Sequence, residues 1–213
     1  MHIQGKEIIV LTAALADNNF EFRKQQYIKA FKTLKKYRYK KFYIIEALKK
    51  NGPTFLDEYS KNVFYSGANN FSLRDKGLNE GITMLEGLRH FRFDTDDMII
   101  KLTGRWCLVS KYFLKLVKKN RNKYHAIAKV CNKYALTQCF AMRYAQFLKM
   151  LQSFDYHALD QKGITIERAV GGYLADKAAS GELRVLFIDK LDIGVDPFGS
   201  TTYPHHLHGE VRL

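Results

Sequence analysis

The sequence predicts an α/β fold with a mostly parallel central sheet flanked by helices. Short apolar runs rich in β-branched residues alternate with stretches whose apolar residues have helical spacing, which is the pattern of such folds. The apolar runs are continuous rather than alternating, as expected for strands that are covered on both faces. The chain has 213 residues, 46% of them hydrophobic, and no Gly/Ser-rich linker or internal repeat divides it, so we expect one domain.

The first half of the chain supplies four predicted strands and two predicted helices. Tyr27, Phe31 and Leu34 recur at the i, i+4, i+7 spacing of an amphipathic helix, and Leu78, Ile82 and Leu85 repeat that spacing. The strands are predicted near residues 7–12, 41–46, 62–66 and 98–103.

The second half is less regular. We expect helices near residues 110–118, 143–153 and 164–179. Strands are expected near residues 125–130 and 137–142, and a last strand near 184–188.

The net charge of +14 is unevenly distributed. Residues 23–50 carry eleven basic side chains and one acidic side chain, and residues 98–154 contain no Asp or Glu. Such a charge attracts an anionic partner, which can be a nucleic acid, an anionic membrane surface or a nucleotide diphosphate. The alternative is a basic face that serves only solubility.

Cysteine use and targeting signals favour a cytoplasmic protein. Cys107, Cys131 and Cys139 fit neither a metal-binding pair nor a disulfide framework, so we expect reduced thiols in the core. No stretch reaches the ~20 apolar residues of a membrane-spanning helix, and the start of the chain lacks the pattern of a signal peptide. We therefore expect no membrane span.

Several catalytic motifs are absent from the sequence. It contains no Walker loop, no GxGxxG after the first strand, no GxSxG and no HExxH. This argues against kinases, NTPases, dehydrogenases, serine hydrolases and zinc proteases.

Small and polar residues follow the first predicted strand and begin the second helix. Thr12 and Ala13 would allow a flat base to approach the backbone, or they form an ordinary tight turn. Lys76 and Asn79 fall on the first helical turn, where free N–H groups favour an anion. The alternative is an ordinary helix start, capped by Asn70 or Ser72.

The segment 99–106 is the most informative, because buried strands rarely carry basic residues. Arg105 can donate two hydrogen bonds to a diphosphate, Lys101 can add a point charge, and Thr103 and Gly104 suit phosphate or sugar contacts. The alternative is that the two basic residues only form ion pairs with Asp96, Asp97 or Glu80.

Four motifs in this order resemble nucleotide-sugar-dependent glycosyltransferases of the GT-A fold, and more closely the glycosyltransferase domain of chlorovirus enzymes that build a capsid glycan. The resemblance covers nearly the whole chain. The motifs are Lys76-Gly77-x-Asn79-Glu80, Ile99-Ile100-Lys101-Leu102-Thr103-Gly104-Arg105, Thr137-x-Cys139-Phe140-Ala141-Met142-Arg143 and Ile164-Thr165-Ile166-Glu167-Arg168-Ala169.

The resemblance implies an enzyme that transfers a hexose or deoxyhexose from a UDP-sugar to an oligosaccharide or glycoprotein acceptor, in a host cytoplasm if the protein is viral. It divides the single domain 1–213 into a nucleotide-binding half, about 1–106, and an acceptor-side half, about 107–213. Thr12 and Ala13 would line the base, whereas Lys76 and Asn79 would face the diphosphate or ribose.

The family's DxD motif, which binds a divalent cation such as Mn²⁺ or Mg²⁺, is replaced here by Thr103-Gly104-Arg105. The one such string, Asp94-Thr95-Asp96, precedes the strand and is better explained as a solvated acidic turn. Either basic side chains make the metal dispensable, or a cation is held by fewer protein ligands. By resemblance, His208 is the predicted metal or phosphate ligand, unless the terminal His residues are only a tail.

Catalysis requires an acid near the anomeric carbon, to deprotonate the acceptor hydroxyl or to stabilise positive charge. We predict Glu167 for this role, at the start of a predicted helix, with Asp192 and Asp196 as weaker candidates. The alternative is that Glu167 only stabilises the helix dipole.

The rival function is a basic module that binds nucleic acid. Aromatic residues interleave the basic runs, as in single-strand binders, but no RNP, KH or helix-turn-helix pattern is present. The sequence therefore favours the enzyme.

Overall fold

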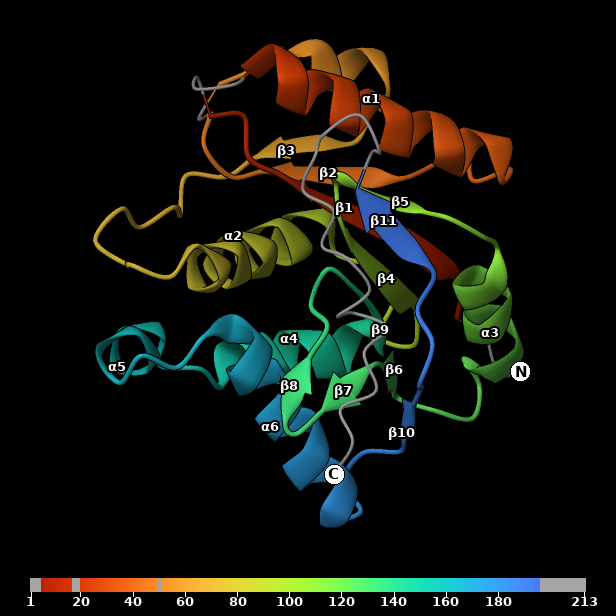
Figure 1. Cartoon of the computed structure of the whole chain (residues 1–213), viewed down its shortest axis with the longest axis vertical. Coiled ribbons are helices and arrows are strands. Elements are labelled where there is room, and N and C mark those ends of the chain that lie inside the picture. The colour runs from red at the N-terminus through yellow and green to blue at the C-terminus, as the bar shows by residue number, and fades with distance from the viewer. Residues whose placement is uncertain (1–4, 17–19, 50, 196–213) are drawn as a thin grey trace.

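The central feature of the computed structural model, which describes residues 5–16, 20–49 and 51–195, is a seven-stranded sheet (Figure 1). Its strand order is β10-β6-β9-β4-β1-β2-β3. Strand β9 runs antiparallel to β4 and β6, and the other neighbouring pairs are parallel. The strands are β1 (Glu7–Ala13), β2 (Tyr43–Glu46), β3 (Val63–Tyr65), β4 (Met98–Thr103), β6 (Ala126–Ala128), β9 (Cys139–Arg143) and β10 (Val185–Phe187).

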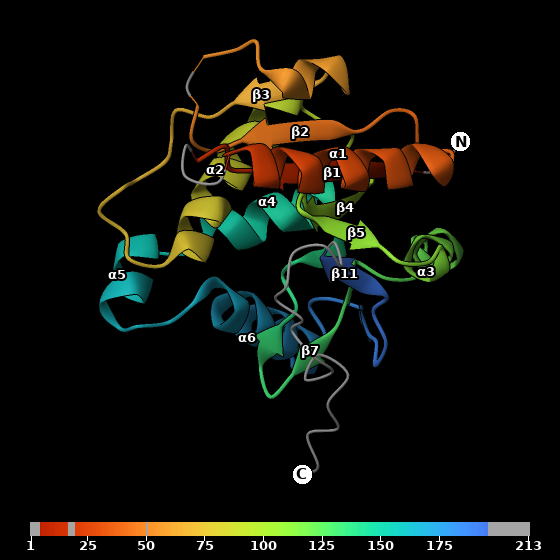
Figure 2. The same ribbon diagram turned by 45° about the horizontal axis from the view of Figure 1, so that its top comes forward.

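Helices cover both faces of this sheet (Figures 1 and 2). Helices α1 (Phe20–Lys36) and α3 (Tyr112–Asn120) pack on one face and contribute to one hydrophobic core. Helices α2 (Lys76–Phe91), α4 (Tyr144–Gln152) and α6 (Ile166–Ala179) build the core on the other face. The mostly parallel α/β sheet flanked by helices is therefore confirmed.

Alternation along the strands decides which side chains face α2. Val10 of β1 and Ile99 of β4 belong to the core beneath α2, whereas the residues next to them in each strand belong to the core beneath α1. Because side chains two residues apart share a face of a sheet, Thr12, Lys101 and Thr103 also face α2. The parallel register pairs Thr12 with Thr103, so these side chains lie together where the two strands end.

Most predicted elements of the second half are present, but short ones were missed. Strand β10 is not the last strand, because β11 follows it. The unpredicted elements are β5 (Trp106–Leu108), which pairs with β11 (Ile193–Val195), the hairpin of β7 (Val130–Cys131) and β8 (Tyr134–Ala135), helix α5 (Tyr156–Gln161) and the 3-10 helix η1 (Phe55–Glu58). Elements of two to six residues are too short to show a hydrophobic period.

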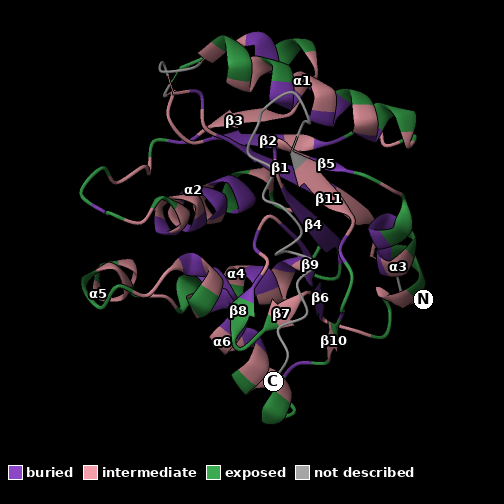
Figure 3. Cartoon of the chain, viewed as in Figure 1, coloured by how far each residue is buried: buried purple, intermediate pink, exposed green. Residues whose placement is uncertain are grey.

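Burial follows the layers, with the central strands buried and the outer helix faces exposed (Figure 3). All three cysteines are free thiols; Cys107 and Cys139 are buried as expected, whereas Cys131 is exposed in the β7–β8 hairpin, so its predicted core position was wrong. Within the ranges that the structure describes, no helix is both long and apolar enough to cross a membrane.

Candidate functional site

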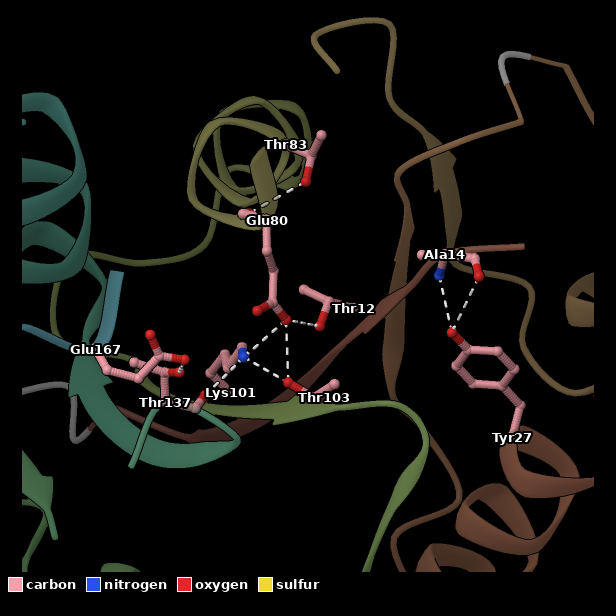
Figure 4. A network of polar contacts seen from close by, with 9 residues as sticks. All are labelled: Thr12, Ala14, Tyr27, Glu80, Thr83, Lys101, Thr103, Thr137 and Glu167. Carbon is pink, nitrogen blue, oxygen red and sulfur yellow. Dashed lines mark hydrogen bonds and ion pairs between the residues drawn. The ribbon is translucent and has the colours of Figure 1, made fainter. Parts of the chain in front are cut away.

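A network of polar side chains lies at the carboxyl ends of β1 and β4 (Figure 4). In α/β sheets this edge is where ligands bind, because loops and helix N-termini converge there. Threonines at the two strand ends and the Lys101 side chain point toward Glu80 on α2. Thr137, which precedes β9, joins them from the second half of the chain.

Glu80 is the hub of this network. One of its carboxylate oxygens, Oε1, accepts hydrogen bonds from the hydroxyls of Thr12 and Thr103, the latter at 3.0 Å. The same oxygen forms an ion pair with the ammonium of Lys101 at 2.8 Å. Lys101 also donates to the Thr103 hydroxyl at 2.7 Å and to the Thr137 carbonyl at 2.6 Å. One acidic side chain therefore connects β1, β4 and α2.

The ion pair between Lys101 and Glu80 explains why a lysine is tolerated in a core strand. The Lys101 side chain is only 4% exposed and that of Glu80 is 24% exposed. Burial acts to raise the pKa of Glu80, but the Lys101 ammonium and the hydrogen bonds from Lys101, Thr12 and Thr103 outweigh it and hold the pKa below its usual range. Glu80 is therefore ionised. Of the two roles that the sequence suggested for Lys101, a contact to a diphosphate or an ion pair with an acidic residue, the structure shows the ion pair, with Glu80.

The network extends to the predicted catalytic acid. The Thr137 hydroxyl donates to Glu167 Oε1 at 3.2 Å, and Glu167 lies in the first turn of α6. Thr137 thus contacts Lys101 through its carbonyl and Glu167 through its hydroxyl. In the described part of the chain, the second carboxylate oxygen of Glu167 has no hydrogen-bond partner, so it is free to contact a reactant.

A second polar cluster surrounds the end of β1 on the α1 face. The Ala14 backbone N–H donates to the Tyr27 hydroxyl at 2.8 Å, and Arg23 donates to the Ala14 carbonyl at 3.4 Å (Figure 4 shows the tyrosine). Burial raises the pKa of Tyr27 to about 12, partly offset by the charges of Arg105 and Arg23. The charges of two guanidinium groups, those of Arg105 and Arg23, therefore act on this hydroxyl at the end of β1.

The turn after β4 brings Arg105 to this position. The Gly104 N–H donates to the Thr12 carbonyl at 2.8 Å, and a Cβ at Gly104 would lie 2.8 Å from that carbonyl oxygen and 2.9 Å from the Tyr27 ring. Only glycine fits such a close approach. No described carboxylate forms an ion pair with Arg105, in contrast to Lys101, which pairs with Glu80.

Glu46 fixes the loops that follow β1 and β2. It is fully buried, and its Oε1 accepts backbone N–H bonds from Leu15 at 3.0 Å, Leu48 at 2.8 Å and Lys49 at 3.1 Å. Burial raises the pKa of this carboxyl, against the effect of these hydrogen bonds. Its other oxygen has no hydrogen-bond partner among the described residues. Glu46 thus acts as a structural acceptor beside the site.

The start of α2 differs in part from the expectation. Lys76 and Asn79 lie on the first turn, as predicted, but the N-cap is Asp75, which accepts from Leu78 N at 2.7 Å. The expected caps were wrong because Asn70 folds onto its own loop: its Oδ1 accepts from the hydroxyl and the backbone of Ser72. Lys76 is exposed, whereas Asn79 accepts the Asn70 N–H at 2.7 Å and supports that loop.

The other acidic candidates lie elsewhere. The Asp94-Thr95-Asp96 turn precedes β4 at the opposite edge of the sheet, and its carboxylates pair with Lys6 and Arg143. Asp192 precedes β11, accepts from Ser110 Oγ at 2.7 Å and pairs with Lys190. Asp196 and His208 lie outside the described residues. Among the residues that the structure describes, no three His, Cys, Asp or Glu side chains cluster as metal ligands would.

Sequence reasoning did not single out Glu80 or Tyr27 as parts of the site. Glu80 was considered only as a possible ion-pair partner, although strand alternation places Lys101 and Thr103 on the face that α2 covers. A buried lysine requires an acidic partner, and this requirement could have identified Glu80 from the sequence. Tyr27 carried no separate signal, because its spacing is that of an ordinary core residue.

Comparison with known proteins supports the fold. No protein-family model and no curated protein matches the sequence. Among solved structures, the chain is similar to the bifunctional IspDF from Campylobacter jejuni, with a TM-score of 0.51 and 14% identity over 86% of this chain and 49% of that one. It is also similar to a 4-diphosphocytidyl-2C-methyl-D-erythritol synthase, with a TM-score of 0.53 and 12% identity over 87% of this chain and 89% of that one.

These similarities define the class of fold. The chain spans about half the length of the bifunctional protein and most of the length of the synthase. At 12–14% identity the similarity concerns the fold alone. It is an α/β fold with a mostly parallel central sheet, which agrees with the predicted fold class.

Proposed function

We propose that this protein is a glycosyltransferase that moves a hexose or deoxyhexose from a UDP-sugar to an oligosaccharide or glycoprotein acceptor. One observation carries the proposal: Thr12 of β1, Thr103 and Arg105 at the end of β4, and Glu167 of α6 converge from three separate segments at the carboxyl edge of a mostly parallel sheet. This edge is the usual ligand-binding position of open α/β sheets.

The donor is proposed to lie along the ends of β1 and β4. The uracil and ribose lie beside Thr12 and Ala13, and Lys76 and Asn79 on the first turn of α2 face the ribose or diphosphate. Arg105 is the main diphosphate ligand, because its charge has no described carboxylate partner and a guanidinium can donate two hydrogen bonds to phosphate oxygens. Lys101 contributes indirectly, since it holds Glu80 and Thr103 in place.

The transfer replaces one bond to the anomeric carbon by another. The bond between this carbon and the phosphate oxygen breaks, and UDP leaves with the electron pair, stabilised by Arg105. The acceptor hydroxyl oxygen forms the new bond, and its proton passes to the free oxygen of the Glu167 carboxylate. Thr137 orients Glu167 through its hydrogen bond at 3.2 Å.

The described residues do not fit a cation held by protein ligands. The expected place of a DxD motif carries Thr103, Gly104 and Arg105, and the carboxylate oxygen that contacts this turn already accepts from Thr12, Thr103 and Lys101. No step of the proposed transfer is therefore assigned to a metal. The prediction that His208 meets a cation or phosphate stays open to test by Mn²⁺ titration of full-length protein.

A second candidate is a nucleotidyl transferase that uses a nucleoside triphosphate. The similarity to a 4-diphosphocytidyl-2C-methyl-D-erythritol synthase over 89% of that chain motivates it. The low identity makes it a weaker candidate, and the resemblance of the four sequence motifs favours sugar transfer. The basic nucleic-acid-binding module is the third possibility that the test below addresses.

The test is a thermal-shift and calorimetric comparison of UDP, GDP, CMP, CTP and a short oligonucleotide. We expect selective stabilisation by UDP, because a ligand that binds only the folded state raises its stability. Selective stabilisation by CTP would support the nucleotidyl transferase. A salt-sensitive response to the oligonucleotide alone would support the nucleic-acid module and end the enzyme proposal.

A further inference from the structure

A pocket lies beside the network, where the first turns of α2 and α6 approach each other. Its volume is about 310 Å³, within the ~300–1,000 Å³ range of typical ligand sites. The residues that line it are Arg74, Asp75, Asp160, Gly163, Ile164 and Thr165.

The polar groups of this pocket are fixed by the backbone around them. One oxygen of Asp160 accepts the N–H groups of Arg74 at 3.1 Å and Asp75 at 3.0 Å, and the other accepts from the Arg74 side chain at 3.4 Å. The Arg74 side chain nevertheless stays 74% exposed. Thr165 is the N-cap residue of α6 but makes no capping hydrogen bond with its side chain, so its hydroxyl is not used by the helix.

An exposed aromatic residue shortly precedes, in the sequence, the residues that line this pocket. Phe71, three residues before Arg74, is 78% exposed, more than any other large hydrophobic side chain that the structure describes. A single exposed apolar residue is unremarkable in a loose loop. The segment that carries Phe71 is, however, tightly fixed on both sides.

The contacts that fix this loop come from three different elements. Asn69 donates to the Ala47 carbonyl at 2.9 Å, and the backbone of Asn70 is held by Asn79 of α2 at 2.7 Å. The Asn70 side chain contacts His157 of α5 at 3.3 Å, and Leu73 is buried in the core. The ring is thus presented to solvent by a loop that hydrogen bonds hold on both sides, and a loop held in place lowers the entropic cost of binding a ligand to it.

The pocket is close to the proposed reaction centre. Gly77 of α2 contacts Ile166 of α6, since a Cβ at Gly77 would lie 2.3 Å from Ile166 Cγ2. The Gly77–Ile166 contact lies between the pocket on one side and the Glu80 network on the other. Thr165, which lines the pocket, precedes Glu167 by two residues. A sugar in the pocket would therefore lie beside the helix turn that carries the proposed acid.

We infer that Phe71 and this pocket form the binding site for the acceptor sugar, with the apolar C–H face of a pyranose stacked on the Phe71 ring and its hydroxyls bonded to Arg74, Asp160 and Thr165. An aromatic surface together with a few fixed polar groups is what a pyranose requires, because one face of the ring is apolar and its rim carries hydroxyls. The inference rests on the proposed function, which supplies the reason for a carbohydrate ligand.

The test uses saturation-transfer NMR with methyl pyranosides of the gluco, galacto, manno, xylo, rhamno and fuco series, on the full chain in the presence of UDP. At least one glycoside should receive saturation at the C–H protons of one ring face. Phe71→Ala should weaken its binding about three- to tenfold, as expected from the loss of an aromatic contact. Phe71→Trp should retain binding.

The control is Phe187→Ala, which removes a ring that is 45% exposed on the edge strand β10. It should leave glycoside binding unchanged. If no glycoside of the panel binds, or if the two alanine variants bind equally well, the inference is wrong. UDP calorimetry separates the two proposals: UDP binding without glycoside binding ends only the acceptor site, whereas glycoside binding without UDP binding ends the proposed transfer and leaves a sugar-binding site.

Discussion

The two ends of β4 carry similar charges in opposite surroundings. At its amino end, Lys6 Nζ and Asp94 Oδ2 lie 3.9 Å apart, and both side chains are 71% exposed. At its carboxyl end, Lys101 Nζ and Glu80 Oε1 lie 2.8 Å apart, and the two side chains are 4% and 24% exposed. The side chains of Lys6 and Asp94 mostly face solvent. The Lys101–Glu80 pair instead contacts two threonine hydroxyls and a backbone carbonyl.

The difference separates a solvated end of the strand from an end where charged side chains are held by several polar contacts. An exposed ion pair contributes only about 0–1 kcal/mol to stability, because water screens the charges. A buried pair loses its hydration and is retained only where further hydrogen bonds satisfy both partners. The Asp94-Thr95-Asp96 string resembles a metal-binding motif but lies at the solvated end, whereas the constrained charges lie at the carboxyl edge.

The largest effect on stability should come from breaking the buried pair. Lys101→Met leaves the Glu80 carboxylate without its counter-charge, and we expect a loss of about 2–4 kcal/mol in the free energy of unfolding, less than for a fully buried pair because Glu80 is partly exposed. Urea unfolding followed by circular dichroism measures this loss. The matched variant Lys6→Met should change stability by about 0.5 kcal/mol or less. Equal losses in the two variants would contradict the comparison.

The next effect concerns chemistry rather than stability. Glu167→Gln keeps the shape of the side chain but removes its charge, so turnover of the UDP-sugar should fall by roughly 10²-fold or more. UDP affinity should stay within a few fold, because a carboxylate does not bind a diphosphate. UDP release and calorimetry measure the two quantities.

The control for this variant is Asp176→Asn on the same helix, which removes an exposed carboxylate paired with Lys133. It should transfer sugar normally. If Glu167→Gln also transfers sugar normally but melts earlier, Glu167 is only a helix-start acid, and Asp192 becomes the next described candidate.

Arg105→Ala tests the arginine of the carboxyl edge that has no carboxylate partner among the described residues. We expect UDP binding to weaken by about 1.5–3 kcal/mol, the usual loss for a charge-assisted hydrogen bond to an anion. Arg89→Ala removes an exposed arginine from the other end of α2 and should leave UDP affinity unchanged. Unchanged affinity in Arg105→Ala, measured by calorimetry, would place the diphosphate elsewhere.

The sequence predicted the strands of this edge well, because β1 and β4 are long apolar runs and their ends are marked by polar residues. It also identified Lys101 as unusual. What it could not decide was the partner of Lys101, since Glu80 is 21 positions away and approaches only when α2 packs on the sheet. Long-range packing of this kind depends on the register of β1 and β4, which no local pattern contains.

The region proposed to bind the acceptor was less predictable for a related reason. The loop before α2 is held by contacts to α5, a helix of six residues with no clear period. Asn70 and Ser72 read locally as helix caps, but they bond to each other instead. Turn residues have several local options, and tertiary contacts choose among them.

The smallest expected effect is a difference in pH dependence between Glu80 and Glu46, two carboxyls of the same edge whose pKa values are shifted in opposite directions. The folded-state pKa of Glu80 is lowered, so the stability that this group contributes is complete above its unfolded pKa of about 4.3 and is lost as pH falls through the lower, folded value. The folded-state pKa of Glu46 is raised by burial, so the folded protein binds its proton first and gains stability as pH falls toward 4.3. Relative to wild type, Glu80→Gln should therefore become less destabilising below about pH 4.3, whereas Glu46→Gln should become more destabilising as pH falls from neutral toward that value. Urea unfolding of the three proteins between pH 3.5 and 7 measures both trends, and parallel curves would show that the Lys101 ammonium does not distinguish the two carboxyls.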